Sequence, residues 1–213
     1  LLDGLNANDR FQRGSYNVHA YDLFRTTDQF NTWGDEAARF QNSAGYLEEF
    51  KSNIDRYLDR TIVHEGDILE KWWLHGPIEI LFIDIAKSPL ILRHVYDMFM
   101  PHMVAGQSYL VHQDFQYPGY PWIVVSMQVM SNYWQVIDFL PNNSAVYQLI
   151  KPVPRELLMD NDWQNLTLDS RQALHRRALE GLPLAGHLML RLNEVQWLVE
   201  EHKEASARDL IEE

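Results

Sequence analysis

The sequence contains no cysteine among its 213 residues. This absence excludes disulfides, thiolate nucleophiles and Cys-ligated zinc, and it is typical of proteins in a reducing compartment. No apolar run reaches the roughly 18 residues that a membrane-spanning helix needs, and no secretory leader is visible. We therefore expect a cytoplasmic protein with no membrane partner.

Basic charge is also scarce. Lys and Arg number 18 against 30 Asp and Glu, which gives a net charge of −12 and argues against nucleic acid as a partner. The motifs G-x-S-x-G and the P-loop are missing, so hydrolase and nucleotide-triphosphatase functions are not expected. H-E-x-x-H is missing too, and we expect His64, His75, His94 and His102 to be surface or packing residues rather than metal ligands.

The chain is rich in apolar residues, and the stretch "IEILFIDIAKSP" (78–89) shows how they are arranged. Residues 78–83 lack polar alternation, which predicts a strand of a parallel sheet buried on both faces. Ser88 and Pro89 predict the N-cap and first position of a helix. Asp84 stands between them, beyond the carboxyl end of the strand, where such sheets bind ligands. The alternative is that Asp84 only helps to cap the helix.

Strand and helix patterns alternate along the chain. We expect strands at 17–22, 61–65, 78–83 and 107–113, helices at 1–8, 44–58, 68–76, 88–103 and 120–134, and a hairpin formed by 135–141 and 144–151 around Asn142-Asn143. This order predicts an α/β fold with a mostly parallel sheet and a C-terminal antiparallel hairpin. Right-handed crossovers would bring four acids to one sheet edge: Asp22, Asp67, Asp84 and Asp114.

The pattern changes at residue 152. A polar connector is followed by expected helices at 168–180 and 184–203, and then by a charged run. The second helix has an apolar stripe that includes Leu188, Leu192 and Val199. We therefore divide the chain into an α/β domain (1–151) and a C-terminal helical extension (152–213). The stripe has three interpretations, which are packing on the sheet, a homodimer contact, or a cap over a site.

The strand-end acids indicate a chemistry. A carboxylate at the position of Asp22 can accept hydrogen bonds from both hydroxyls of a ribose, and one at Asp67 can receive an adenine amino group. Together they suggest an adenosine-containing ligand. His112 is the candidate general base, with Asp84 or Asp114 orienting it or the acceptor. The two carboxylates and a neighbouring amide oxygen also predict a site for a hard cation such as Mg²⁺.

Four segments, "HAYDLF", "VHEGD", "IEILFID" and "VAGQSYLVHQDF", resemble successive strand ends of class I S-adenosylmethionine-dependent methyltransferases. The likeness is greatest to macrocin-type small-molecule O-methyltransferases and runs from residue 1 to about 150. The resemblance implies a Rossmann-like methyltransferase fold with S-adenosylmethionine as cofactor and a small-molecule hydroxyl as acceptor. It assigns cofactor binding to Asp22, Phe24, Gly66, Asp67 and Asp84, catalysis to His112, Asp84 and Asp114, and a metal to Asp84 and Asp114.

The sequence departs from the resembled pattern in two places. The first strand and glycine-rich cofactor turn are not found, so we expect an N-terminally incomplete fold that binds S-adenosylmethionine very weakly or not at all. Ala86 stands where the macrocin-type pattern has a further Asp, and Gln113 where an acid is common. Two alternatives stay open. One is a catalytically inactive interaction or oligomerisation module, and the other is a nicotinamide-dependent dehydrogenase.

Overall fold

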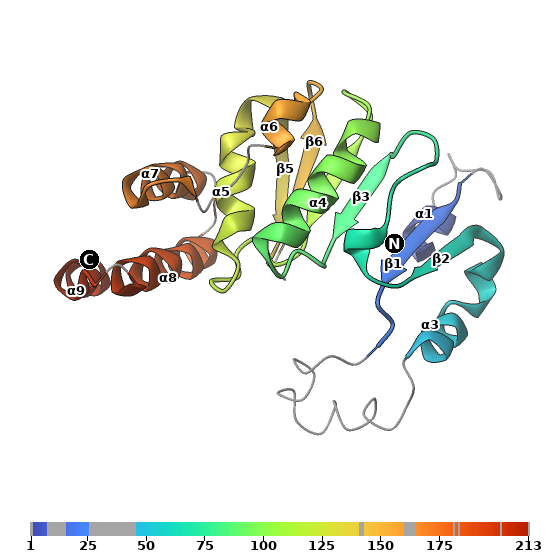
Figure 1. Ribbon diagram of the computed structural model, residues 1–213, viewed down its shortest axis with the longest axis horizontal. Coiled ribbons are helices and arrows are strands. Elements are labelled where there is room, and N and C mark those ends of the chain that lie inside the picture. Colours follow the sequence, from blue (N-terminus) through green and yellow to red (C-terminus); the bar gives the residue numbers. More distant parts are fainter. Residues whose placement is uncertain are drawn as a thin grey trace. The chain divides into compact units, whose positions relative to one another are not determined.

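The structure is a computed structural model that describes residues 2–7, 16–25, 46–140, 143–159, 165–180, 182, 184–200 and 202–212. Asn142 of the expected hairpin turn lies outside these residues. The chain forms two compact units, unit 1 (Leu1–Lys71) and unit 2 (Trp72–Glu213). The architecture is a mixed α/β one, as expected (Figure 1). None of the described helices is long and apolar enough to cross a membrane.

Unit 1 contains a two-stranded parallel sheet. Its elements are α1 (Leu2–Ala7), β1 (Val18–Asp22), α3 (Leu47–Asn53), a 3₁₀ helix (Asp55–Arg60), β2 (Thr61–Glu65) and a 3₁₀ turn (Ile68–Glu70). In the β1–β2 register, Val18 pairs with Thr61 and Asp22 with Glu65. Both expected strands are therefore confirmed, and their carboxyl ends share one edge. The expected helix at 68–76 is wrong beyond Glu70, since a segment so short does not offset the cost of helix nucleation.

Unit 2 contains a four-stranded mixed sheet in the order β3-β4-β6-β5. The strands are β3 (Ile80–Ile83), β4 (Tyr109–His112), β5 (Trp134–Leu140) and β6 (Ser144–Leu149). Strands β3 and β4 are parallel, whereas β6 is antiparallel to both β4 and β5. The expected closing hairpin is thus confirmed, and its second strand is inserted next to β4. Since β3 and β4 run in the same direction, the residues that follow them meet at one edge of the sheet.

Helix α4 (Pro89–Phe99) makes the crossover from β3 to β4. The Ser88 hydroxyl accepts a hydrogen bond from the Ile91 N–H at 3.3 Å, and Pro89 occupies the first turn, as the sequence predicts. The buried residues of α4 recur at helical spacing: Leu92, Val95, Tyr96 and Phe99. Figure 1 shows α4 in front of the sheet, and the Tyr96 hydroxyl of α4 lies 2.8 Å from His112 Nε2 of β4.

The expectation that residues 78–83 are buried on both faces is wrong. Ile83 is buried, but Ile80 and Phe82 are 40% and 52% exposed. Within unit 2, β3 is an edge strand, so its second face lacks the cover that a central strand receives.

The helices that follow β4 belong to unit 2. They are α5 (Pro121–Val129), a 3₁₀ turn (Ser131–Tyr133), α6 (Arg155–Met159), α7 (Leu168–Leu179), α8 (Leu184–Glu200) and α9 (Glu204–Glu212). Helix α7 packs against α5 and α8, so the segment after residue 152 joins the α/β core in one compact unit. The division into 1–151 and 152–213 stays a prediction. The expected charged run after α8 forms a further helix, α9, in which most of the described residues are exposed.

The apolar residues of α8 divide between two faces. Leu190, Trp197 and Leu198 are buried, whereas Leu188, Leu192 and Val199 are exposed. One face therefore packs within unit 2, where α8 contacts α7 and α9. Packing of the stripe on the sheet stays a prediction. The homodimer through the exposed face stays a prediction.

A polar cluster is buried between α7 and α8. His175, Asn193 and Glu194 are each at most 1% exposed. The His175 Nδ1 and Glu194 Oε1 atoms lie 3.5 Å apart, and the Asn193 amide nitrogen lies 3.5 Å from His175 Nε2. Arg176 and Arg191 approach the Glu194 carboxylate to 3.9 and 4.0 Å. Neither Glu194 oxygen has a hydrogen-bond partner among the described residues. The buried Glu194 carboxylate therefore depends on the nearby charges of Arg176 and Arg191 for its stabilisation.

We expect His175→Leu and Glu194→Leu to lower the free energy of unfolding by on the order of 3–5 kcal/mol each, because either change leaves a buried polar partner uncompensated. The double variant should lose less than the sum by about 1–3 kcal/mol. Urea unfolding followed by tryptophan fluorescence measures this, since the Trp197 ring lies 5.2 Å from that of His175. Arg208→Gln on the exposed face of α9 is the control. Single variants as stable as the control would contradict the interpretation.

Candidate functional site

Asp22 ends β1 and is held by its own surroundings. Its Oδ1 accepts hydrogen bonds from the Phe24 N–H at 2.8 Å and from the Tyr46 hydroxyl. Phe24 is buried and has a φ of 50°, so the chain turns sharply just after the strand. Burial, and then the bond to Asp22, raise the pKa of Tyr46. No hydrogen bond to Oδ2 of Asp22 comes from the described residues, which leaves this oxygen for a ligand.

Gly66 and Asp67 follow β2 at the same edge of the unit 1 sheet. The Gly66 N–H donates to the Asp22 carbonyl at 3.0 Å, which continues the pairing of the two strands. Gly66 has a φ of 122°, a backbone conformation that residues with a side chain rarely adopt. The Asp67 carboxylate is exposed and accepts a hydrogen bond from the Leu69 N–H at 2.9 Å. Asp67 therefore caps the 3₁₀ turn while its other oxygen faces solvent.

The second pair of acids forms an ionic cluster with Lys87 in unit 2. Asp84 follows β3 and Asp114 follows β4, at the edge that the parallel pairing creates. Lys87 Nζ donates to Asp84 Oδ1 at 3.0 Å and to Asp114 Oδ2. Asp114 has a φ of 58°, a conformation that Asp tolerates better than most residues. We call Asp84, Lys87 and Asp114 the strand-end cluster.

The charge state of Lys87 follows from these contacts. Burial alone would lower the pKa of its ammonium, but the hydrogen bonds that it donates to Asp114 and Asp84, and their negative charges, outweigh burial, and the pKa is raised. Lys87 is therefore charged at neutral pH and offers no lone pair to a proton. Its contribution can only be electrostatic, either to the two carboxylates or to a ligand.

Aromatic side chains lie beside the strand-end cluster. Lys87 Nζ is 5.2 Å from the centroid of the Tyr120 ring, which adds a cation–π contact. The indole N–H of Trp122 donates to the Ala86 carbonyl at 2.9 Å and ties the loop after β3 to the start of α5. Burial raises the pKa of Tyr120, although the Lys87 charge acts against it. Tyr120 and Trp122 could therefore form one wall of a ligand site next to the two carboxylates.

His112 lies in the core. Its ring is fully buried, and its Nε2 is 2.8 Å from the Tyr96 hydroxyl of α4. Burial lowers the pKa of His112 to about 3, so the ring is neutral at neutral pH. Neither ring nitrogen of His112 is exposed at the sheet edge in this structure. Catalysis by His112 stays a prediction. The neighbouring Gln113 points elsewhere, since its Oε1 accepts a hydrogen bond from the Ser144 hydroxyl at 2.8 Å.

The two residues expected to hold a metal, Asp84 and Asp114, are the carboxylates of the strand-end cluster. The Lys87 ammonium already bridges the carboxylates of Asp84 and Asp114. A divalent cation at these two acids would have to displace it. The structure thus pairs Asp84 with Asp114, as the sequence predicts, and adds a bound cation of the protein's own.

The two expected acid pairs belong to different units. Asp22 and Asp67 share an edge in unit 1, and Asp84 and Asp114 share an edge in unit 2. A single crevice formed by all four acids stays a prediction.

Two contacts were not anticipated from the sequence. Tyr46 hydrogen-bonds Asp22 across 24 positions, and His19 lies next to His64 across 45 positions. The only signal for the second contact is that "HAYD" and "VHEGD" both place a histidine in a strand of the same parallel pair.

A separate pocket of about 270 Å³ is lined by residues of unit 2: Trp72, Trp73, Leu74, Asp97, Met98, Pro101, His102 and Arg155. Arg155 pairs with Asp97 at 3.3 Å in its wall. These residues do not include the strand-end cluster, so the pocket is no part of the site predicted from the sequence.

No known protein family matches the chain, and no curated protein matches it either. The site therefore has to be interpreted from its own geometry.

We expect Lys87→Met to create a Mg²⁺ site. Without the ammonium, two carboxylates face each other at the sheet edge and attract a hard cation. Isothermal titration should show Mg²⁺ affinity at least about tenfold higher than in the wild type. Asp138→Asn, which removes an exposed acid of β5, is the control for bulk charge. Equal Mg²⁺ affinity in wild type and Lys87→Met would show that Lys87 does not occupy the cation position.

We expect His112 to make the protein sensitive to mild acid. The pKa of His112 in the folded protein, about 3, lies below the usual 6.5. The contribution of the neutral ring to the free energy of unfolding is therefore fully present above pH 6.5 and is lost as the pH falls toward 3. The loss is about 1.4 kcal/mol per pH unit, or about 2 kcal/mol between pH 7 and 5. Urea unfolding at both pH values should show a smaller loss in His112→Gln, which keeps an acceptor for Tyr96. His202→Asn, at an exposed position with a φ of 55°, should behave as wild type.

Proposed function

We propose that the protein is an S-adenosylmethionine-dependent methyltransferase that acts on a hydroxyl of a small molecule. The observation that carries the proposal is the edge of the unit 1 sheet. There Asp22 ends one strand, and Gly66-Asp67 follows its parallel neighbour. Acids at adjacent strand ends suit the ribose and adenine of an adenosine moiety.

The described residues fit the adenosine part of such a cofactor. Asp22 Oδ1 is fixed by the Phe24 N–H and Tyr46, which orients the carboxylate while Oδ2 remains for a ribose hydroxyl. Gly66 adopts a φ of 122° and so forms the turn that places Asp67 directly after β2. The Lys71 side chain lies beside this turn and donates to the Glu65 carbonyl at 2.6 Å. Bound S-adenosylmethionine would supply an electrophilic methyl group. The residues of unit 1 bind and orient, and none of them needs to react.

The strand-end cluster is assigned to the acceptor. A charged Lys87 can donate a hydrogen bond to the acceptor oxygen and stabilise negative charge as its proton leaves. Asp84 is the more exposed of the two carboxylates, with 59% of its side chain accessible against 21% for Asp114. We therefore assign proton acceptance to Asp84, while Asp114 holds Lys87 in place. Holding the acceptor in line for transfer would provide most of the rate.

One observation favours the second candidate, an interaction module. Strand β3 is a sheet edge whose side chains Ile80 and Phe82 are exposed, and such an edge can pair with a strand from another chain. A non-catalytic module of this kind would have no need of the acids that follow β1 to β4. The dehydrogenase alternative would use the same Asp22 with a nicotinamide dinucleotide.

NMR titration of the ¹⁵N-labelled chain tests the proposal, because it detects the weak binding that we expect. S-adenosylhomocysteine should shift the amide signals of Asp22 to Phe24 and of Gly66 and Asp67. Asp22→Asn should weaken this binding by on the order of 1–3 kcal/mol, about 5- to 150-fold, since a charge-assisted hydrogen bond is lost.

Asp138→Asn is the matched control and should bind as the wild type does. Titration with NAD⁺ separates the alternatives. Shifts at Asp22 with NAD⁺ but not with S-adenosylhomocysteine would replace the proposal by the dehydrogenase. Shifts with neither compound would favour the interaction module.

A further inference from the structure

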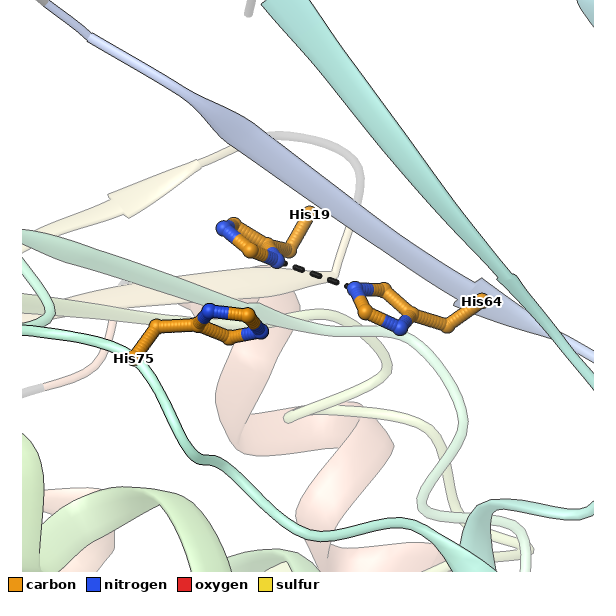
Figure 2. A group of neighbouring side chains, drawn as sticks. All are labelled: His19, His64 and His75. Atoms are coloured by element: carbon orange, nitrogen blue, oxygen red, sulfur yellow. Dashed lines mark hydrogen bonds between the residues drawn. The ribbon is translucent and has the colours of Figure 1, made fainter.

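Two histidines of unit 1 face each other on the parallel β1–β2 sheet. His19 Nδ1 and His64 Nε2 are 2.9 Å apart and share a hydrogen bond (Figure 2). The register explains the contact. Tyr21 pairs with His64, and His19 stands two residues before Tyr21 on the same strand, so all three side chains project from one face. His75, also drawn in Figure 2, belongs to unit 2.

Stacking restricts the two rings. The Tyr21 and His64 rings lie 4.1 Å apart at an interplanar angle of 4°, and the His19 and His64 rings lie 5.2 Å apart at 15°. Both histidines are half-buried. The pair is therefore partly preorganised, which lowers the side-chain entropy that a ligand must offset when it binds.

The distance between the two nitrogens suits a metal ion. Atoms 2.9 Å apart that each bind an ion at about 2.0–2.1 Å subtend an angle of about 90°. This is the angle between adjacent ligands in square-planar and octahedral coordination, which Cu²⁺ and Ni²⁺ prefer. A tetrahedral Zn²⁺ site would need about 3.3–3.4 Å between the same atoms.

Protonation and charge are also compatible with a metal. Two neutral imidazoles share one N–H in the hydrogen bond. When a metal binds, the donor ring can move that proton to its other nitrogen, so the pair offers two lone pairs without net proton release. The net charge of −12 attracts cations to the protein as a whole.

We propose that His19 and His64 form a bidentate site for a late first-row divalent metal ion, with Cu²⁺ preferred. The ion joins β1 to β2, and water or other donors complete its coordination. A two-stranded sheet has little stability of its own, so a metal that bridges its strands stabilises unit 1. This site is independent of the proposed methyl transfer, since neither histidine is assigned to it.

Isothermal titration of the full chain with Ni²⁺, and electron paramagnetic resonance of its Cu²⁺ complex, test the site. The Cu²⁺ spectrum should show hyperfine coupling to two imidazole nitrogens. His19→Phe and His64→Phe keep a ring at each position and should each weaken Ni²⁺ binding at least about tenfold. The double variant should bind no more weakly than either single variant, because the loss of one ligand already destroys the chelate.

Three results would overturn the proposal. They are wild-type Ni²⁺ affinity in both single variants, independent and additive losses in the double variant, and a Cu²⁺ spectrum with coupling to fewer than two nitrogens. His202→Asn, in which a histidine is removed from an exposed position of unit 2, controls for adventitious binding and should match the wild type. The spectrum needs only the wild-type protein, so the test holds even if a variant does not fold.

Discussion

The parallel pairing of β3 with β4 is the constraint on which the candidate site of unit 2 depends. It places Ile83 opposite His112, so the next turns bring Asp84 and Asp114 to one edge. Two carboxylates brought this close repel each other unless a cation lies between them. Lys87 supplies that cation from the loop that starts the crossover helix. The parallel strand direction thus creates the pair of carboxylates, and the loop before α4 supplies the positive charge that stabilises it.

The same rule acts in unit 1 with a different result. Pairing of β1 with β2 brings Asp22 next to the turn at Gly66, but there the carboxylate accepts hydrogen bonds from neutral donors and not from an ammonium. An anionic oxygen held by neutral donors suits a neutral polyhydroxy ligand such as ribose. Carboxylates bridged by a lysine suit a reaction in which charge is displaced. This contrast is the physical basis for the different roles that we propose for the two edges.

Polar groups buried away from these edges serve the fold. His112 bonds Tyr96 beneath α4, and Glu194 lies between α7 and α8 among three basic side chains. Each such group costs stability unless its partner stays in place, and so it fixes which helix face meets which neighbour. His112, which the sequence suggested as a catalytic base, therefore belongs to the core. His64, for which no functional role was expected, is half-buried and lies beside His19.

The sequence by itself determined the features that depend on neighbouring residues. These are the start of α4 at Ser88-Pro89, the closing hairpin, and the strands that end at acids, because caps, turns and apolar periodicity act within a few residues. Only the tertiary structure decided that Lys87 reaches Asp114 across 27 positions and that His19 meets His64 across 45. It also decided that His112 is buried and that Phe82 is exposed. These outcomes depend on strand order and on which face a helix covers, and both are set by contacts between segments far apart in the chain.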